Sequence, residues 1–369
     1  MADWRSALES MELTSLYRGA YRNRRVLVTG HTGFKGSWLA YWLTQMGAEV
    51  SGLALAPEGE PNHWQLLGLN LANDMRIDIK DADALQQAIN HIKPEVIFHL
   101  AAQPLVRRSY FDPINTFQTN IVGTINLYEA VRNCPSVSVL VNATTDKVYA
   151  EQSTLTGYAE NDKLGGHDPY STSKACVELI SESYQQCFFT PNIRLATARS
   201  GNVIGGGDWG EDRLIPDAVR SIQESKPLNL RYPNAVRPWQ HVLEPLSGYL
   251  LLGQKLLESA DAVGAWNFGP NAESEISVSA LLGKLKQSLP KLMVHSDAET
   301  NLHEANILRL NCTKAKTQLS WQPVWNLEES LFKTAQWYKN FHTHGMLDSA
   351  ENLVSFINDA KQRNAVWAQ

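Results

Sequence analysis

Tyr170 and Lys174, in the stretch YSTSK, are the side chains whose types and spacing best suit acid–base chemistry. Residues four apart share one face of a helix, which brings the phenol and the ammonium together. A phenol has a pKa of roughly 10 and is a poor base near neutral pH, but a neighbouring cation lowers that pKa. Tyr170 is therefore predicted to take a proton from a substrate hydroxyl as a hydride leaves. The ordinary alternative is an exposed pair on a helix surface.

A second candidate pair, Asp146 and Lys147, lies in the stretch TTDKVY, directly after the apolar run VLVNA. A buried strand that ends there would open into a cleft at the edge of a sheet. The two side chains could form an ion pair that only stabilises the strand end, or they could move protons. Thr145 could bind the same hydroxyl as Tyr170.

Residues 29–36 read TGHTGFKG, with glycines at 30, 33 and 36 between a predicted strand and a predicted helix. Gly30 permits a tight turn, Gly33 lets backbone N–H groups approach a pyrophosphate, and Gly36 allows close packing of helix on sheet. The helix N-terminus adds partial positive charge. In this context the spacing favours dinucleotide binding over a turn without a ligand. An oxidised nicotinamide would then accept the hydride, and Lys174 could hold its ribose.

The residues leave the choice between NAD and NADP open. The second strand ends in VSGLALAP, which lacks the acidic residue that usually contacts the adenosine ribose. No arginine stands there for a 2′-phosphate, although Lys35, which we expect to contact the cofactor, is near. Asp78 and Ile79 are predicted to flank the adenine, with a helix N-terminal carboxylate as the alternative for Asp78.

From Arg25 onward, short apolar strands alternate with helices, which predicts a Rossmann-type α/β fold, a doubly wound parallel sheet. The expected strands cover residues 25–30, 49–55, 76–79, 95–102, 138–145 and 193–205. The alternation stops after Gly205. We therefore expect a Rossmann domain over 1–204, with 1–24 as an N-terminal arm or helix. Residues 205–369 should form mainly a smaller C-terminal substrate-binding lobe, which includes a short strand at 305–310, while part of 237–270 returns to the first domain.

Composition excludes several classes of protein. The chain has 43% hydrophobic and 19% charged residues and a net charge of −5, so it is an ordinary globular protein and a poor candidate for nucleic-acid binding. Its four cysteines have no C-x-x-C spacing, which fits a reducing cytoplasm. We expect no signal peptide, no transmembrane helix and no metal site.

The motifs TGHTGFKG, HLAAQ, TTDKVY and YSTSK, in this order, resemble the extended short-chain dehydrogenase/reductase superfamily. The likeness extends through RSGNVIGGGDW, DRLIP and RPWQHV, from about Val26 to beyond Pro270. GHTGFKG, the lysine of TTDK, GGGDWGEDRLIPD and VRPWQHVLEPLSGYL resemble more specifically the CDP-D-glucose 4,6-dehydratase family. The resemblance implies tightly held NAD, a CDP-glucose substrate and a role in deoxysugar synthesis for bacterial surface polysaccharide such as the O-antigen of lipopolysaccharide.

The resemblance also implies a reaction. Tyr170, Lys174 and NAD oxidise C4 of the hexose, the C4 ketone acidifies the C5 proton, water leaves from C5 and C6, and the hydride returns to C6. By position, Asp146 is the acid for the C6 hydroxyl and Lys147 the base for C5. This assignment needs a raised pKa at Asp146 and a lowered one at Lys147. Lys147 could instead stay charged and stabilise the enolate.

Further binding residues follow from the same resemblance. Arg237 corresponds to a diphosphate-binding arginine, Arg213 to a loop that covers the base, and Asn202 to a position that bonds the diphosphate or sugar. Gln103 and Arg108 could reach the hexose or brace the site. The remaining expected contacts are Thr32, Phe34, Leu100, Ala101, Ala102 and Thr119 with the cofactor, and Leu214, Ile215 and Thr145 with the substrate.

Two other functions stay open from the sequence. A nucleotide-sugar epimerase, or a dehydratase for another nucleotide sugar, would share the cofactor site, but an epimerase would not depend on Asp146 and Lys147. A non-catalytic NAD-binding sensor would not need the pair Tyr170 and Lys174. A homodimer or homotetramer is expected from the superfamily.

Overall fold

A computed structural model describes residues 13–152, 156–189, 191–296 and 307–369. The first twelve residues of the predicted N-terminal arm lie outside this description, as do Ala305 and Asn306 of the predicted short strand. The described part of the arm forms a short helical segment, η1 (Leu13–Gly19).

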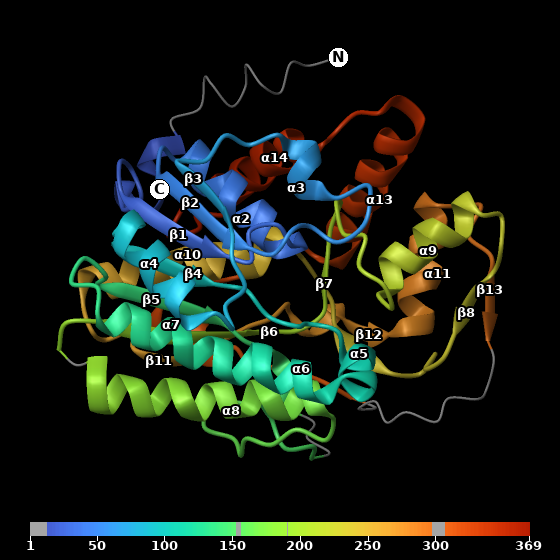
Figure 1. The fold of residues 1–369 in the computed structure, drawn as a ribbon. Coiled ribbons are helices and arrows are strands. Elements are labelled where there is room, and N and C mark those ends of the chain that lie inside the picture. The colour runs from blue at the N-terminus through green and yellow to red at the C-terminus, as the bar shows by residue number, and fades with distance from the viewer. Residues whose placement is uncertain (1–12, 153–155, 190, 297–306) are drawn as a thin grey trace.

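A seven-stranded parallel sheet forms the centre of the fold (Figure 1). Its strand order is β11-β6-β5-β4-β1-β2-β3, with the order reversing between β1 and β4. The middle strands are apolar runs buried along nearly their whole length, as a sheet covered on both faces requires. This arrangement confirms the predicted doubly wound fold. The bounds are β1 (Arg25–Thr29), β2 (Glu49–Ala54), β3 (Asn73–Arg76), β4 (Val96–His99), β5 (Val139–Ala143), β6 (Arg194–Ser200) and β11 (Gly264–Phe268).

The third strand was predicted wrongly. It covers Asn73–Arg76 instead of residues 76–79, and Ser51 of β2 pairs with Asn73. At a sheet edge, pairing with the neighbouring strand decides which residues belong to the strand. Polar residues that alternate in exposure can therefore form β3. The more apolar residues that follow leave the sheet and lead into the next helix.

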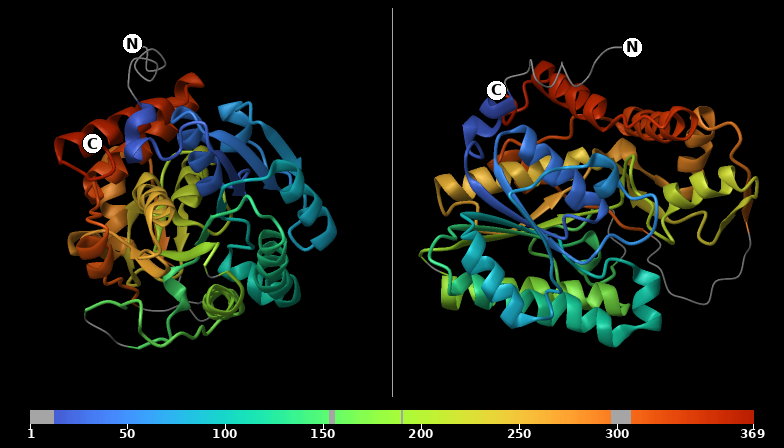
Figure 2. Two further views of the ribbon diagram at one scale, coloured as in Figure 1. Left: turned by 90° about the vertical axis from the view of Figure 1, so that its left-hand side faces the viewer. Right: turned by 45° about the horizontal axis from the view of Figure 1, so that its top comes forward.

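Helices cover both faces of the sheet (Figures 1 and 2). On one face, a core rich in aromatic side chains includes Trp38, Trp42 and Phe356. The helices on this face are α2 (Phe34–Gln45), α10 (Leu243–Glu258) and α14 (Ser349–Gln362). The opposite face is covered by α4 (Ala82–Ile92), α7 (Gly123–Arg132) and α8 (Pro169–Tyr184). The long helix predicted over 115–133 is a succession of α6 (Pro113–Phe117), the π-helical η2 (Gln118–Val122) and α7.

A smaller lobe lies beyond the carboxyl ends of the strands, at the right of Figure 1. Its core joins α9 (Leu214–Gln223), α11 (Val278–Ser288) and α13 (Leu327–His344). Four short strands pair within it: β8 (Leu228–Leu230) with β13 (Val294–Ser296), and β9 (Val236–Pro238) with β12 (Glu275–Ser277). Shorter elements complete the described chain: α3 (His63–Leu67), α5 (Val106–Phe111), α12 (Thr313–Gln318), β7 (Val203–Ile204), β10 (Gln240–His241), η3 (Asp146–Val148), η4 (Gln185–Phe189) and η5 (Ala272–Ser274).

The C-terminal half returns to the main sheet twice. β11 pairs with β6 and α10 packs beside it, while the last helix, α14, packs against α2. Near the two ends of the described chain, the ring of Tyr17 stacks on Trp367 at 5.3 Å. The domain boundaries themselves stay a prediction.

Candidate active site

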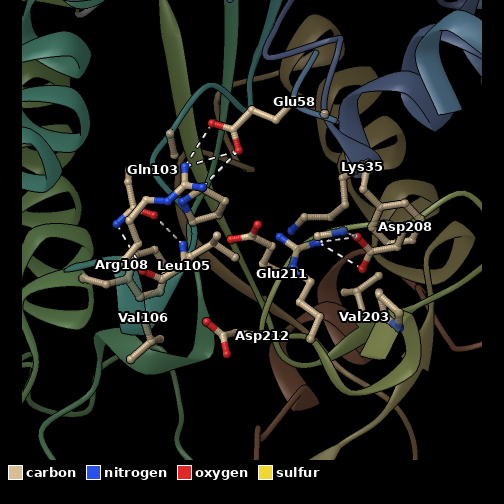
Figure 3. Close-up of a pocket in the computed structure, with 18 of the residues that line it drawn as sticks. Lys35, Glu58, Gln103, Leu105, Val106, Arg108, Val203, Asp208, Glu211 and Asp212 are labelled. Carbon is tan, nitrogen blue, oxygen red and sulfur yellow. Dashed lines mark hydrogen bonds and ion pairs between the residues drawn. The ribbon is translucent and has the colours of Figure 1, made fainter. Parts of the chain in front are cut away.

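One cavity of about 1070 Å³ lies at the carboxyl ends of the parallel strands, between the sheet and the smaller lobe. Ligands of doubly wound folds bind at this edge, beside the point where the strand order reverses. Every residue predicted from the sequence to bind or react lines this cavity. Figure 3 shows part of its lining, with side chains from both sides converging.

The glycine loop leads from β1 into α2 and leaves no room for side chains at two positions. Gly30 has a φ of +74°, and a Cβ there would lie 2.7 Å from the backbone nitrogen of Ala101. A Cβ on Gly36 would lie 2.1 Å from the carbonyl oxygen of Gly30. Gly33 is the N-cap of α2, so unpaired N–H groups of the first turn border the cavity. The loop thus has the backbone that a pyrophosphate requires.

Asp78 and Ile79 follow β3 and line the cavity. The Asp78 carboxylate accepts the backbone N–H of Lys80 at 2.9 Å in the turn before α4, whereas Asp81 is the N-cap of that helix, so the helix-capping alternative for Asp78 is wrong. Ile79 packs on Gly123, where a Cβ would lie 2.6 Å from its side chain. The structure therefore places an apolar side chain and a carboxylate together at the cavity wall.

Lys35 does not lie beside Asp78 and Ile79. Its Nζ donates to Ser200 Oγ at 3.3 Å and to the Tyr249 hydroxyl at 3.4 Å, at the end of β6. In Figure 3 its side chain runs from the glycine loop into the cavity. Burial, and then the charge of Arg213, lower the pKa of Lys35 to about 8, while Asp146 acts in the opposite direction.

Tyr170 and Lys174 lie on the first turns of α8. Asp168 caps this helix by accepting the backbone N–H of Ser171 at 2.9 Å. Tyr170 is only 8% exposed and Lys174 only 6%, so the surface-pair alternative is wrong. Lys174 Nζ donates to the carbonyl oxygen of Ala143, at the end of β5, at 3.3 Å.

Burial dominates the electrostatics of this pair. It raises the pKa of the Tyr170 phenol, whereas the neighbouring Thr145 lowers it. Burial, reinforced by the charge of Lys35, lowers the pKa of Lys174 to about 8, and Glu178 opposes that fall. The pKa of Tyr170 therefore lies well above that of Lys174. Further positive charge beside the phenolate would be needed to lower it.

The stretch that follows β5 turns into a short 3₁₀ segment, η3, which presents Asp146 to the cavity. Thr145 caps this turn, and its Oγ1 donates to Asp146 Oδ1 at 3.1 Å. Burial raises the pKa of Asp146, although Lys147 and then Arg237 act against it. Oδ2 is buried without a hydrogen-bond partner among the described residues, so no ion pair with Lys147 holds it.

A buried ion pair lies behind this turn, and sequence reasoning missed it. Glu178 Oε2 accepts from Arg199 at 2.7 Å, and Glu178 also accepts from Thr144. Arg199 donates to the Tyr149 hydroxyl at 2.8 Å, at the other end of the turn. Glu178 follows Lys174 by one helical turn. This spacing could have predicted that the two side chains lie on the same face of α8.

The predicted substrate residues divide into two groups. Arg213, Arg237 and Asn202 come from the smaller lobe and from the end of β6, and all three line the cavity. The Arg213 guanidinium pairs with both oxygens of Asp208 at 3.1 Å. Arg237 is buried, and its Nη1 donates to the carbonyl oxygen of Val236 at 2.9 Å.

Gln103 and Arg108 lie on the sheet side of the cavity. The Gln103 amide donates to Thr116 Oγ1 at 2.9 Å and accepts the Leu105 N–H at 2.6 Å, so it braces its own loop. Arg108 forms a forked ion pair with Glu58, with contacts of 2.9–3.2 Å, as Figure 3 shows. Glu58 carries no sequence signal that separates it from other surface carboxylates, whereas Asp208 is buried and lies within the motif GGGDWGEDRLIPD.

His99, within the apolar run VIFHLAA, is buried between the hydroxyls of Thr29 and Thr124 at 2.7 and 3.2 Å, as a core histidine. Two further observations bear on the predicted exclusions. Within the described ranges, no group of three or more His, Cys, Asp or Glu side chains is arranged to hold a metal ion. None of the helices described is both long and apolar enough to span a bilayer.

Comparison with known proteins agrees with the fold. Residues 27–334 match the model of a family described as GDP-mannose 4,6 dehydratase. The "CDP-glucose 4,6-dehydratase" of Salmonella typhimurium (strain LT2) is 45% identical over 331 residues, which cover 86% of this chain and 91% of that protein. A "UDP-glucose 4-epimerase" of Pisum sativum is 27% identical over 86% of this chain and 96% of its own length.

Solved structures show the same architecture. A UDP-glucose 4-epimerase from Thermotoga maritima has a TM-score of 0.77 at 24% identity, covering 86% of this chain and 99% of that one. A dTDP-glucose 4,6-dehydratase from Streptomyces venezuelae, solved with NAD, has a TM-score of 0.75 at 24% identity, covering 88% and 99%. The fold and site define a dinucleotide-fold protein of the extended short-chain dehydrogenase/reductase type. The chain belongs to the GDP-mannose 4,6 dehydratase family, which confirms the resemblance to nucleotide-sugar 4,6-dehydratases.

Proposed function

We propose that this chain converts CDP-D-glucose to CDP-4-dehydro-6-deoxy-D-glucose and water, with NAD as a bound cofactor. The observation that carries the proposal is the buried carboxyl of Asp146 beside Tyr170, in a chain 45% identical to a CDP-glucose 4,6-dehydratase. An epimerase needs the tyrosine–lysine pair alone. Elimination of water also needs an acid for the leaving hydroxyl, and burial raises the pKa of Asp146, which favours that role.

The residues of the cavity fit a dinucleotide. The glycine loop would hold its pyrophosphate at the N-terminus of α2, Ile79 and Asp78 would flank the adenine, and Lys174 would hold the nicotinamide ribose. When bound, NAD accepts a hydride from C4 of the hexose and later returns it to C6. Leu100, Ala101, Ala102 and Thr119 line the same wall.

Each reacting side chain has a distinct role in the proposal. Tyr170 takes the proton of the C4 hydroxyl, assisted by Lys174 and oriented by Thr145. Asp146 donates a proton to the C6 hydroxyl as it leaves. Lys147, half-buried at the cavity wall, takes the C5 proton and returns it at the end. Arg237, Arg213 and Asn202 would bind the diphosphate and sugar from the smaller lobe.

The test is the mass of the product after incubation of the purified protein with CDP-glucose, with and without added NAD. Loss of one water, with no net accumulation of NADH, is the expected result. Unchanged mass with inverted sugar stereochemistry would support an epimerase instead. If no nucleotide sugar reacts and Tyr170→Phe changes nothing measurable, the sensor alternative would replace the proposal.

The dehydratase pair has its own test. Lys147→Ala should abolish water loss while leaving hydride transfer from C4, so that NADH absorbance accumulates on the protein. Lys226→Ala, at an exposed lysine far along the chain, serves as the control and should leave turnover unchanged. A cytoplasmic location and a homodimer or homotetramer complete the proposal and rest on the family alone.

A further inference from the structure

We propose that Arg107 and Asp212 form a bridge across the rim of the cavity, which keeps the sugar nucleotide enclosed until the hydride has returned to it. The proposal rests on the proposed function and adds to it a control over release. The bridge is closed during the chemical steps and open while substrate enters and product leaves. Both residues line the cavity.

The two residues of the bridge come from opposite walls. Arg107 lies on α5, which packs against α6 and α8 on the sheet side. Asp212 lies in the loop that leads from β7 to α9 in the smaller lobe. Arg107 Nη1 donates to Asp212 Oδ1 at 2.7 Å, across 105 residues of sequence. In Figure 3, Asp212 lies between side chains of the two walls. The contact therefore joins the sheet side to the lobe.

The loop that carries Asp212 is held by the smaller lobe. Arg220 of α9 donates to the carbonyl oxygens of Trp209 and Gly210, both at 3.0 Å. Arg231, directly after β8, donates to the same Oδ1 of Asp212 at 2.9 Å. The loop and its carboxylate therefore belong to the lobe, and the bond from α5 is the arm that crosses the cavity.

The bridge lies at the rim of the cavity, away from the reacting centre. The side chains of Arg107 and Asp212 are 42% and 35% exposed, whereas Tyr170 and Asp146 are buried. Ion pairs with this exposure are weak and are screened by salt. A contact of that strength can break and form again each time substrate and product exchange.

The proposed reaction gives the bridge its purpose. Oxidation moves a hydride from C4 to NAD, and a proton leaves the C4 hydroxyl. Water is then lost from C5 and C6, and the product forms only when the hydride returns to C6 and a proton to C5. A sugar that escapes before this return has two hydrogens too few, and the cofactor stays reduced. The protein then has no oxidant for its next substrate, so closure of the cavity preserves activity.

The charge of Asp212 determines whether the rim closes. Its Oδ1 accepts from two guanidinium groups, and without the carboxylate Arg107 and Arg231 would face each other as like charges. Asp212 has a φ of +57°, a left-handed conformation that Asp and Asn adopt more readily than most residues. Asp212→Asn therefore keeps the backbone and an oxygen acceptor while it removes the charge.

The experiment follows many turnovers of the holoenzyme with CDP-glucose. It measures the absorbance of NADH that stays on the protein and the masses of the released sugar nucleotides. In Arg107→Met we expect a normal first turnover, followed by a rise of reduced cofactor at least tenfold above wild type for each product formed. Released CDP-4-dehydroglucose, or the enone formed from it by loss of water, should match this NADH in amount. Asp212→Asn should show the same effect, and Arg107→Lys, which keeps a cation, a smaller one.

Arg363→Met is the matched control. Arg363 pairs with Glu329 at the same distance of 2.7 Å, with side chains 46% and 35% exposed, where the end of α14 meets the start of α13. Neither residue lines the cavity. The control should retain its intermediates as wild type does. Added salt should raise escape from wild type toward the level of Arg107→Met, because it screens exposed ion pairs.

Two results would overturn the proposal. If Arg107→Met raises KM but releases every reacted sugar as dehydrated product, Arg107 binds substrate and does not retain the intermediate. If Arg107→Met and Asp212→Asn behave like the control, the bridge has no role in enclosure. Asp212→Asn alone decides the question if Arg107→Met loses its dinucleotide or melts early. Failure of the proposed function is a separate outcome, because wild-type protein would then release no water from CDP-glucose.

Discussion

Glu178 and Arg199 form an ion pair of 2.7 Å in which each side chain is only 3% exposed, directly behind the turn that carries Asp146. The pair fixes both ends of that turn, through Thr144 on one side and Tyr149 on the other. Removal of one partner from a buried pair leaves an uncompensated charge, which is strongly destabilising.

Glu178→Ala should therefore lower the free energy of unfolding by about 3–5 kcal/mol, measured by urea denaturation. Glu328→Ala removes an exposed partner of Lys284 and should change the same quantity by less than about 1 kcal/mol. Equal effects in the two variants would show that the buried pair adds nothing beyond a surface contact.

Lys174→Met should stabilise the protein at neutral pH while abolishing activity. Burial lowers the pKa of Lys174 to about 8, so below pH 8 the folded state must hold a buried charge that the unfolded chain leaves in water. The wild-type free energy of unfolding therefore rises with pH between about 8 and 10.5, where the unfolded chain binds more protons. The gain from methionine should reach about 1–3 kcal/mol at pH 7 and vanish near pH 10.5.

Urea unfolding of dinucleotide-free protein at pH 7 and pH 10 measures this difference. Lys226→Met, at an exposed lysine, should show no such pH-dependent gain. A variant that is equally stabilised, or destabilised, at both pH values would contradict a buried charge at Lys174.

Lys35→Met should reduce kcat by tenfold or more and leave the amount of bound NAD unchanged. The ammonium lies at Ser200 and Tyr249 and interacts with Asp146, not with the adenosine side of the cavity. Dinucleotide content after purification and turnover with saturating CDP-glucose are the two measurements. Loss of NAD, with activity restored by added NAD, would instead confirm the sequence-based assignment of Lys35 to cofactor binding.

Gly206→Ala should destabilise the fold by about 1–3 kcal/mol or more, because a Cβ there would lie 2.0 Å from the buried ring of Trp337. This contact joins the loop after β7 to α13. Gly283→Ala is the matched control within α11, where a Cβ meets nothing within 4 Å and helix propensity predicts a gain of about 0.5–1 kcal/mol. Thermal unfolding of both variants decides whether the loop tolerates any side chain.

The sequence predicts those parts of the site that depend on local structure. The glycine loop and the spacing of Tyr170 and Lys174 each lie within one strand–turn–helix unit, so their geometry follows from neighbouring residues. The direction of Lys35 and the partner of Glu178 depend on β6, which reaches the site only after the sheet has assembled. Such contacts between distant segments leave no periodic signal.

The predicted span of the third strand was wrong for a related reason. Apolar character favoured residues 76–79, but pairing with β2 at the sheet edge selected Asn73–Arg76. The pairing partner of an edge strand is a property of the folded sheet, so local composition does not determine its span.

Three arginines of the cavity already have carboxylates as partners: Arg108 with Glu58, Arg213 with Asp208, and Arg107 with Asp212. In the proposed function only Arg213 of these three binds the diphosphate, and a phosphate there would compete with Asp208 for the guanidinium, as an exchange of one counter-ion for another. Little net charge is neutralised in such an exchange, and added salt weakens the internal pairs as well as the new ones. A substrate would therefore meet arginines whose charge carboxylates already compensate, rather than an excess of positive charge.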